Sequence, residues 1–193
     1  MSFDLNIYLE NIDDSIIAEW IKELNKLDMI CEIYPGFSFM NYSGFVPFKI
    51  NIQRNTKKEL MNCDYLTGFE IYINKFKLSE NIESLKRTSL FGRLFSKKNA
   101  DIYFASPDID KKLKLCKKVI TFNFGSFDTL EFRIALLSAA ILSKLKNGLC
   151  YFPADNIWCN NDTIIDDMLN GTIDYENSLK SGQIKLHKFE KWL

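Results

Sequence analysis

Residues 128–148 read DTLEFRIALLSAAILSKLKNG, a run that is apolar on nearly every side when it is drawn as a helix. Its first four residues form a capping box, in which the side chains of Asp128 and Glu131 can bond the free amides of the first turn. Asn147-Gly148 supplies a stop signal. A helix that is apolar all round must be covered by protein on most sides. The run therefore predicts the centre of the core and does not predict an active site.

Two strand-helix-strand units surround this centre in the sequence. The first has an alternating strand, a helix that starts near Asp14 and a returning strand; the second has a strand, the apolar helix and another strand. Their strands are expected at residues 3–9, 29–34, 119–124 and 149–152. We expect an α+β fold in which a mostly antiparallel sheet packs against two long helices, with ferredoxin-like repeats. Chance similarity between the two units is the open alternative.

The whole chain, residues 1–193, is predicted to be a single domain. Its hydrophobic content of 47% is sufficient for a sizeable core. Residues 79–100 are rich in Ser, Asn, Lys and Arg and predict an irregular insertion, whose mobility is left open. The tail from residue 162 onwards predicts short C-terminal helices, divided near Asn170-Gly171.

The composition favours the cytoplasm. No basic region followed by an apolar run begins the chain, and no apolar run reaches the roughly 18 residues of a membrane span. The five cysteines are an odd number and predict free thiols in a reducing compartment. A net charge of zero gives no general attraction to nucleic acid or to an anionic membrane.

Familiar catalytic and metal-binding patterns are missing from the sequence. His187 is the only histidine and is expected on a surface helix. The chain has no CxxC pair and no glycine-rich phosphate loop. We therefore expect no enzyme, no catalytic residue, no metal site and no cofactor. The alternative is an enzyme with a dispersed carboxylate or thiol site, for which Cys150 and Cys159 are the only candidates worth testing.

Charge is distributed unevenly along the chain. Residues 86–118 contain ten basic residues and three acids. Within them, Phe91, Arg93, Phe95, Lys97 and Lys98 could contact phosphates or an anionic surface, or could form a solvated loop. Residues 151–178 contain six acids and no Lys or Arg. Acids beside aromatic rings can steer and anchor a basic protein. The predicted partner-binding residues are Asp155, Trp158, Asp162, Asp166, Asp167, Asp174 and Tyr175. The alternative is a solvated surface whose aromatic rings point inward.

A further pattern spans residues 119–160. The Ala-rich helix 134–145, Asn147-Gly148, Tyr151-Phe152-Pro153 and Trp158 follow one another in this order. In style this segment resembles the bacterial immunity proteins encoded beside polymorphic toxins. The resemblance implies a protein that binds and blocks a toxin without catalysis, and it transfers no individual binding residue.

The sequence thus favours a non-enzymatic cytoplasmic protein-binding module, an immunity or inhibitor protein, with a basic protein as its partner. The alternative function is a small-molecule-binding regulatory domain. Its pocket is expected between the sheet and the helices, lined by Phe, Tyr and Trp.

Overall fold

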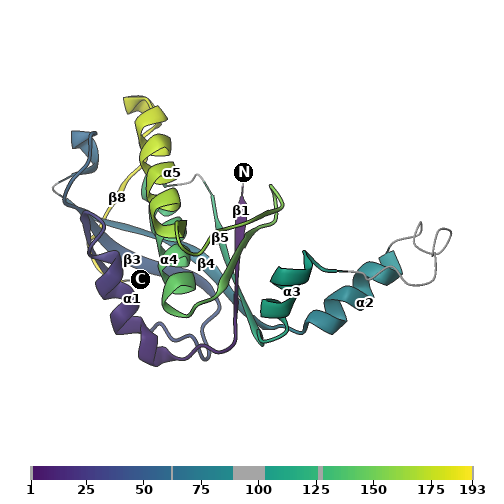
Figure 1. The fold of residues 1–193 in the computed structure, drawn as a ribbon. Helices are drawn as coiled ribbons and strands as arrows, with labels where there is room; N and C mark the ends of the chain where they lie inside the picture. Colours follow the sequence, from purple (N-terminus) through teal and green to yellow (C-terminus); the bar gives the residue numbers. More distant parts are fainter. Residues whose placement is uncertain (1, 62, 89–102, 126–127, 193) are drawn as a thin grey trace.

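The fold is α+β and is built on one antiparallel sheet. The computed structural model describes residues 2–61, 63–88, 103–125 and 128–192. Within these residues the sheet has eight strands in the order β2-β3-β4-β5-β1-β6-β7, with β8 paired to β4 (Figure 1). The strands are β1 (Phe3–Leu9), β2 (Met29–Ile33), β3 (Gly44–Ile52), β4 (Asp64–Lys75), β5 (Lys118–Phe124), β6 (Leu149–Phe152), β7 (Ile157–Trp158) and β8 (His187–Lys188).

Helices cover both faces of this sheet. Helix α4 packs on β1, β4 and β5, while α1 and α5 pack against α4. Helices α2 and α3 lie apart from these three, on the other side of β1 (Figure 1). The helices are α1 (Ile17–Leu24), α2 (Leu78–Thr88), α3 (Pro107–Leu113), α4 (Thr129–Leu145) and α5 (Ile164–Ser178). Within the described ranges, no helix has the length and apolar character that crossing a membrane requires.

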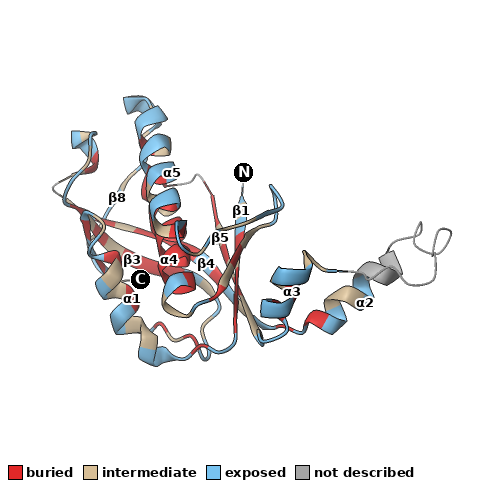
Figure 2. Ribbon diagram, viewed as in Figure 1, coloured by how far each residue is buried: buried red, intermediate tan, exposed pale blue. Residues whose placement is uncertain are grey.

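Helix α4 is the centre of the core, as the sequence predicts. Every residue from Arg133 to Ser143 is buried, and Figure 2 shows the helix enclosed between the sheet and its neighbours. Asp128 caps its first turn by accepting a hydrogen bond from the Leu130 amide at 2.6 Å. The Trp20 indole of α1 donates a hydrogen bond to the Ser138 carbonyl of α4 at 2.9 Å. This bond stabilises the packing of the two helices.

The end of α4 positions strand β6 against β1. Asn147 adopts the left-handed conformation with φ of 47°, and the Gly148 amide donates to the Ser143 carbonyl at 2.8 Å. This is a Schellman-type end of a helix. A Cβ on Gly148 would lie 2.4 Å from the Leu9 side chain. Only glycine therefore lets the chain turn into β6 so close to β1.

A smaller core lies on the opposite face of the sheet. Tyr8 alternates with Ile7 and Leu9 along β1, so its ring projects away from α4. It packs with Phe76, Leu78 and Leu113 under helices α2 and α3. The chain therefore has two apolar layers, and β1 contributes to both.

The ferredoxin-like pair of units is not confirmed. Strands β5 and β6 flank β1, so β5-α4-β6 is a split β-α-β unit. Strands β1 and β2, by contrast, have three strands, β3, β4 and β5, between them. The first helix is also short, because α1 has 8 residues against 17 for α4. The strand order therefore does not contain two equal repeats, and the first of the two expected long helices is short.

The predicted division of the C-terminal tail is wrong. Helix α5 runs through Asn170-Gly171 without a break, because Ile164, Met168 and Thr172 all pack inward on one side. A short 3-10 turn, Ser181–Gln183, and strand β8 follow it.

The predicted irregular insertion at 79–100 is also wrong in its first part, where α2 extends to Thr88. Residues 89–100 lie outside the described residues.

A buried ion pair joins α4 to α5. The Arg133 guanidinium donates to the Glu176 carboxylate through Nε at 2.7 Å and Nη2 at 2.8 Å. The two side chains are only 2% and 1% exposed. Asn55 donates to the same carboxylate at 2.6 Å. Burying either charge without its partner is strongly unfavourable, so the pair fixes α5 on the core.

We expect Arg133→Met to lower the free energy of unfolding by about 3–5 kcal/mol, because Glu176 would stay buried without its counter-charge. Chemical denaturation measures this. The double variant Arg133→Met/Glu176→Met should recover most of the loss. Lys26→Met breaks the exposed pair with Glu23 and should change stability by less than about 1 kcal/mol. Equal losses of stability in Arg133→Met and Lys26→Met would contradict the role given to the buried pair.

Candidate functional site

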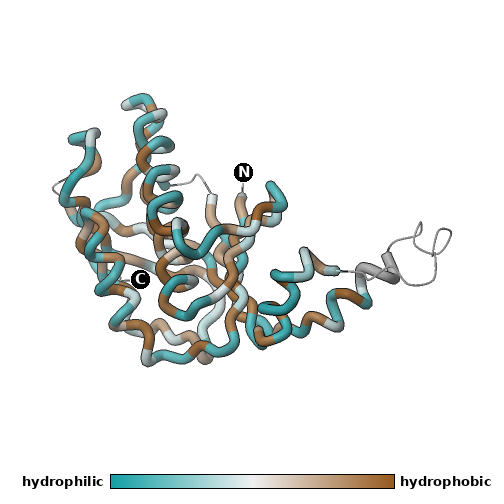
Figure 3. Tube along the Cα trace, viewed as in Figure 1, coloured by the Kyte–Doolittle hydropathy of each residue, from teal (hydrophilic) through white to brown (hydrophobic). Residues whose placement is uncertain are grey.

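The predicted acidic residues project into solvent from one side of α5 and from the segments before it. Ile164, Met168, Thr172 and Glu176 recur every four residues and face the core. Asp166, Asp167 and Asp174 lie on the exposed side of α5, and Figure 3 shows hydrophilic and hydrophobic residues alternating along the helix. We call the exposed acids of this region the acidic face: Asp155, Asp162, Asp166, Asp167 and Asp174.

An apolar groove borders the acidic face where the β6–β7 hairpin meets the start of α5. It has a volume of about 330 Å³ and is lined by Phe152, Ile157, Trp158, Ile164 and Met168, with Asp155 and Asp167 among its walls. We call it the hairpin groove. The Ile157 side chain at the tip of the hairpin is 53% exposed. Apolar surface and unneutralised carboxylates thus occur side by side.

The two predicted aromatic anchors turn inward. Trp158 stacks on Tyr151 with ring centroids 4.5 Å apart and lies 5.5 Å from Tyr8, so its ring belongs to the smaller core. Tyr175 packs on Phe132 at 4.6 Å. Burial raises the pKa of the Tyr175 hydroxyl, helped by nearby acids. The structure brings Asp155, Trp158 and Asp167 together at the groove, and it places Tyr175 about two helical turns further along α5.

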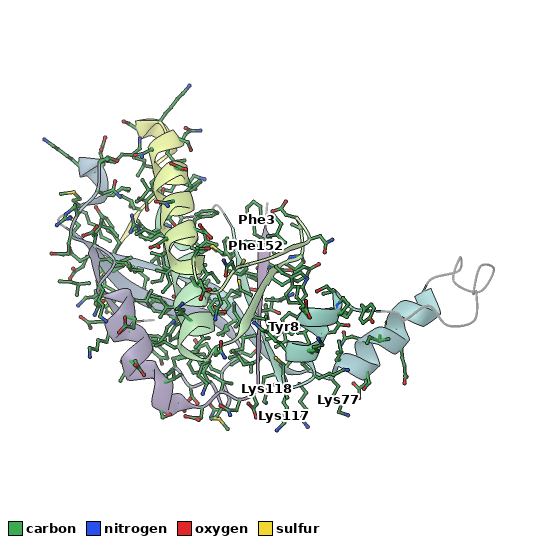
Figure 4. The ribbon with its side chains drawn as sticks, in the orientation of Figure 1. Phe3, Tyr8, Lys77, Lys117, Lys118 and Phe152 are labelled. Carbon is green, nitrogen blue, oxygen red and sulfur yellow. The ribbon has the colours of Figure 1, made fainter. Side chains whose placement is uncertain are left out.

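Basic side chains gather at the other end of the molecule. Figure 4 shows Lys77, Lys117 and Lys118 where β4 and β5 meet α2, away from α5. Near the acidic face, Lys144 approaches Asp162 at 3.8 Å, with both side chains well exposed. Such a pair neutralises little charge. The predicted phosphate-contacting residues Phe91, Arg93, Phe95, Lys97 and Lys98 lie outside the described residues.

A second cavity, of about 390 Å³, opens at the start of α4. It forms because β5 ends at Phe124 while β4 continues towards its partner β8, which leaves a gap beside Thr67 and Gly68. Phe45 and Phe124 give the cavity apolar walls. Its charged residues are Glu70, Asp128, Glu131 and His187. We call it the Asp128 cavity.

Asp128 is the buried charged group of this cavity, with 10% of its side chain exposed. One carboxylate oxygen caps α4 and lies 3.3 Å from the Thr67 hydroxyl. The other, Oδ2, has no hydrogen-bond partner among the described residues, and His187 Nε2 is 3.9 Å away. Burial raises the pKa of this carboxyl despite the amides and His187, which lower it. The cavity therefore offers an unpaired carboxyl oxygen to a hydrogen-bond donor, such as a cationic group.

Sequence reasoning missed this cavity. Asp128 is fully explained by capping when only its neighbours in the chain are considered. His187 was expected on a surface helix, but it lies on β8, because the tail pairs with β4 through Leu66. The Thr129 amide donates to the Lys185 carbonyl at 2.9 Å and fixes the tail beside α4. No local sequence signal predicts this pairing between residues so far apart in the chain.

Metal binding finds no support in the described part of the chain, where no cluster of three or more His, Cys, Asp or Glu side chains could hold an ion. The five cysteines are free. Comparison of the chain with protein-family models, with curated proteins and with solved structures gives no match. A function is therefore inferred from the geometry of the chain itself.

We expect Asp128→Asn to raise the free energy of unfolding, relative to the wild type, more at pH 7 than at pH 3. Because the pKa of Asp128 is raised on folding, its contribution to stability is complete below the unfolded pKa and is lost as the pH rises through the folded pKa. Asparagine caps helices as well as aspartate and does not ionise. Denaturation at both pH values measures the difference. Asp162→Asn on the exposed surface is the control, and a pH-independent effect of Asp128→Asn would contradict the prediction.

Proposed function

We propose that this chain is a non-enzymatic cytoplasmic protein-binding module that holds a basic protein against the acidic face and the hairpin groove. The observation that carries the proposal is the apolar hairpin groove, which has Asp155 and Asp167 in its walls and continues into the other exposed acids of the acidic face. The resemblance of residues 119–160 to immunity proteins suggests that the partner is a toxin and that binding blocks it.

Electrostatics supports a basic partner. From Tyr151 to Ser178 the chain has no Lys or Arg, so a cationic surface would meet little repulsion at the first turns of α5. Lys57, which donates to the Leu179 carbonyl, lies at the other end of the helix. The lysines at the opposite end give the molecule a charge asymmetry that would orient an approaching basic protein with α5 foremost. Long-range attraction of this kind raises the association rate and weakens as salt screens it.

Apolar contacts would supply the energy that exposed charges do not. The hairpin groove can accept an apolar side chain of the partner between Ile157 and Met168. Ile173, beside Asp174, is 37% exposed and extends the apolar surface along α5. Buried anchors surrounded by polar groups are the usual source of affinity in protein interfaces. The inward Trp158 supports the wall of the groove.

We expect Asp166→Lys/Asp167→Lys to weaken binding of the partner about tenfold or more, or by at least ~1.4 kcal/mol. Wild-type and variant proteins serve as baits in the native cell extract at low and moderate salt, and retained proteins are identified by mass spectrometry. The identified protein is then purified and titrated calorimetrically. If it is a toxin, co-expression with the wild-type chain should restore growth, and co-expression with the variant should not.

The matched control is Glu10→Lys/Glu19→Lys, which reverses two exposed acids outside α5. It has the same net charge as the α5 variant and should retain the partner. A partner that both double variants lose equally responds to total charge rather than to the acidic face. A partner that neither variant loses would place the interface elsewhere, and both outcomes reject the proposal.

The second candidate function is that of a small-molecule-binding regulatory domain. It is favoured by the Asp128 cavity, where a buried carboxylate oxygen lacks a hydrogen-bond partner among the described residues. The expected ligand carries a cationic group for Asp128 and an apolar body for Phe45 and Phe124. The sequence predicted a pocket lined by Phe, Tyr and Trp. Among the described walls of this cavity, Phe is present and Tyr and Trp are not.

Benzamidine is a suitable probe of this cavity, since it joins a planar cation to an aromatic ring. We expect it to raise the melting temperature in a concentration-dependent manner, because it binds the folded chain alone. Neutral benzamide and anionic benzoate should have little effect, and Asp128→Asn should abolish the shift. Equal shifts with all three compounds, or a shift that survives Asp128→Asn, would exclude recognition of a cation at this site.

A further inference from the structure

Cys150 and Cys159 face each other across the β6–β7 hairpin. Tyr151 pairs with Trp158 and Phe152 with Ile157, so the next pair along the ladder is Cys150 with Cys159. The Cys159 amide donates to the Cys150 carbonyl at 2.9 Å and confirms this register. Hydrogen-bonded opposite residues have Cα atoms about 5.5 Å apart. That separation lies within the range that a disulfide spans.

The two thiols lie on the same face of the sheet. Cys150 is 2% exposed and packs in the main core beneath α4. Cys159 is half-buried and lines the hairpin groove on one side. On the other side it lines a polar groove with Asn147, Lys144 and Asp162. Solvent therefore reaches Cys159, with Cys150 directly behind it.

The contact between the two thiols gives them different acidities. A hydrogen bond from the Cys150 thiol lowers the pKa of Cys159, although burial and the Asp167 carboxylate oppose this effect. The same bond and burial raise the pKa of Cys150. Elsewhere in the chain, burial raises the pKa of Cys116 to about 11 and that of Cys31 to about 12. Cys159 is thus suited to act as the attacking thiolate.

We propose that Cys150 and Cys159 form a redox-active dithiol that is oxidised to an intramolecular disulfide by small disulfides such as oxidised glutathione. The Cys159 thiolate attacks one sulfur of the oxidant, forms a mixed disulfide and releases one glutathione thiolate. The Cys150 thiol then loses its proton and attacks the Cys159 sulfur. This step forms the internal disulfide and releases the second glutathione. Two protein thiols are oxidised, and one glutathione disulfide is reduced to two thiols.

This reactivity needs no protein partner and is independent of the function proposed above. Oxidation would close the base of the hairpin covalently and change the wall that the two grooves share. The test therefore uses the oxidant alone with the folded, full-length protein.

Folded protein is incubated with oxidised glutathione, quenched with acid and followed by intact mass spectrometry. The wild type should lose two hydrogens without accumulating a glutathione adduct at this site, and peptide mapping should find residues 150 and 159 linked. Cys150→Ser should instead accumulate one stable glutathione adduct on Cys159. Cys159→Ser should leave Cys150 in the thiol form, because that side chain is buried.

Cys116→Ser is the matched control, since Cys116 is another half-buried cysteine, and it should form the disulfide at the wild-type rate. A stable glutathione adduct on Cys159 in the wild type would overturn the proposal, as would an unreactive Cys159. Peptide mapping of the wild type decides the question even if a serine variant folds poorly.

Discussion

A guanidinium cannot be buried without a counter-charge, and this constraint on Arg133 governs how the C-terminal third of the chain is arranged. Helix α4 is enclosed on all sides, so the charge within it must be met by another buried group. Glu176 provides that group from α5, and Asn55 completes the contact from the loop after β3. One interaction thus joins three segments that are distant in the sequence.

The rotation of α5 about its axis follows from this pair. Glu176 ends the inward row that begins at Ile164, so the acids at 166, 167 and 174 have only the outward side available. Tyr175 of the same helix lies towards the start of α4, where burial and then the nearby Asp128 and Glu131 carboxylates raise the pKa of its hydroxyl. The described walls of the Asp128 cavity include no residue of α5, so the acidic face and the cavity are separate surfaces.

Local sequence patterns predicted the parts of the fold that local physics determines. Helix α4, its caps and the alternating strands followed from periodicity and from residues that end helices. The exposure of Asp166 and Asp167 was also predictable, since consecutive positions of a helix surface do not face each other and a solvated surface accommodates both. The Arg133–Glu176 pair was not, because its partners are separated by 43 residues and neither has a distinguishing neighbour.

The Asp128 cavity escaped prediction for a related reason. Its walls come from β3, β4, β5, α4 and the C-terminal tail, and only the sheet order brings these together. The inward orientation of Trp158 was equally undetermined, because a two-residue strand is too short for alternation to indicate a face. Both failures concern contacts between elements rather than the elements themselves.

The central position of β1 has a consequence for how the chain is made. Ile7 pairs with Ile120 on one side and with Cys150 on the other, so β1 is synthesised well before either of its neighbours. Until β5 and β6 are synthesised, β1 presents apolar side chains and open backbone edges to solvent. Such long-range pairing slows folding and exposes the nascent chain to aggregation. Biogenesis of this protein should therefore depend on chaperones that shield β1 during translation.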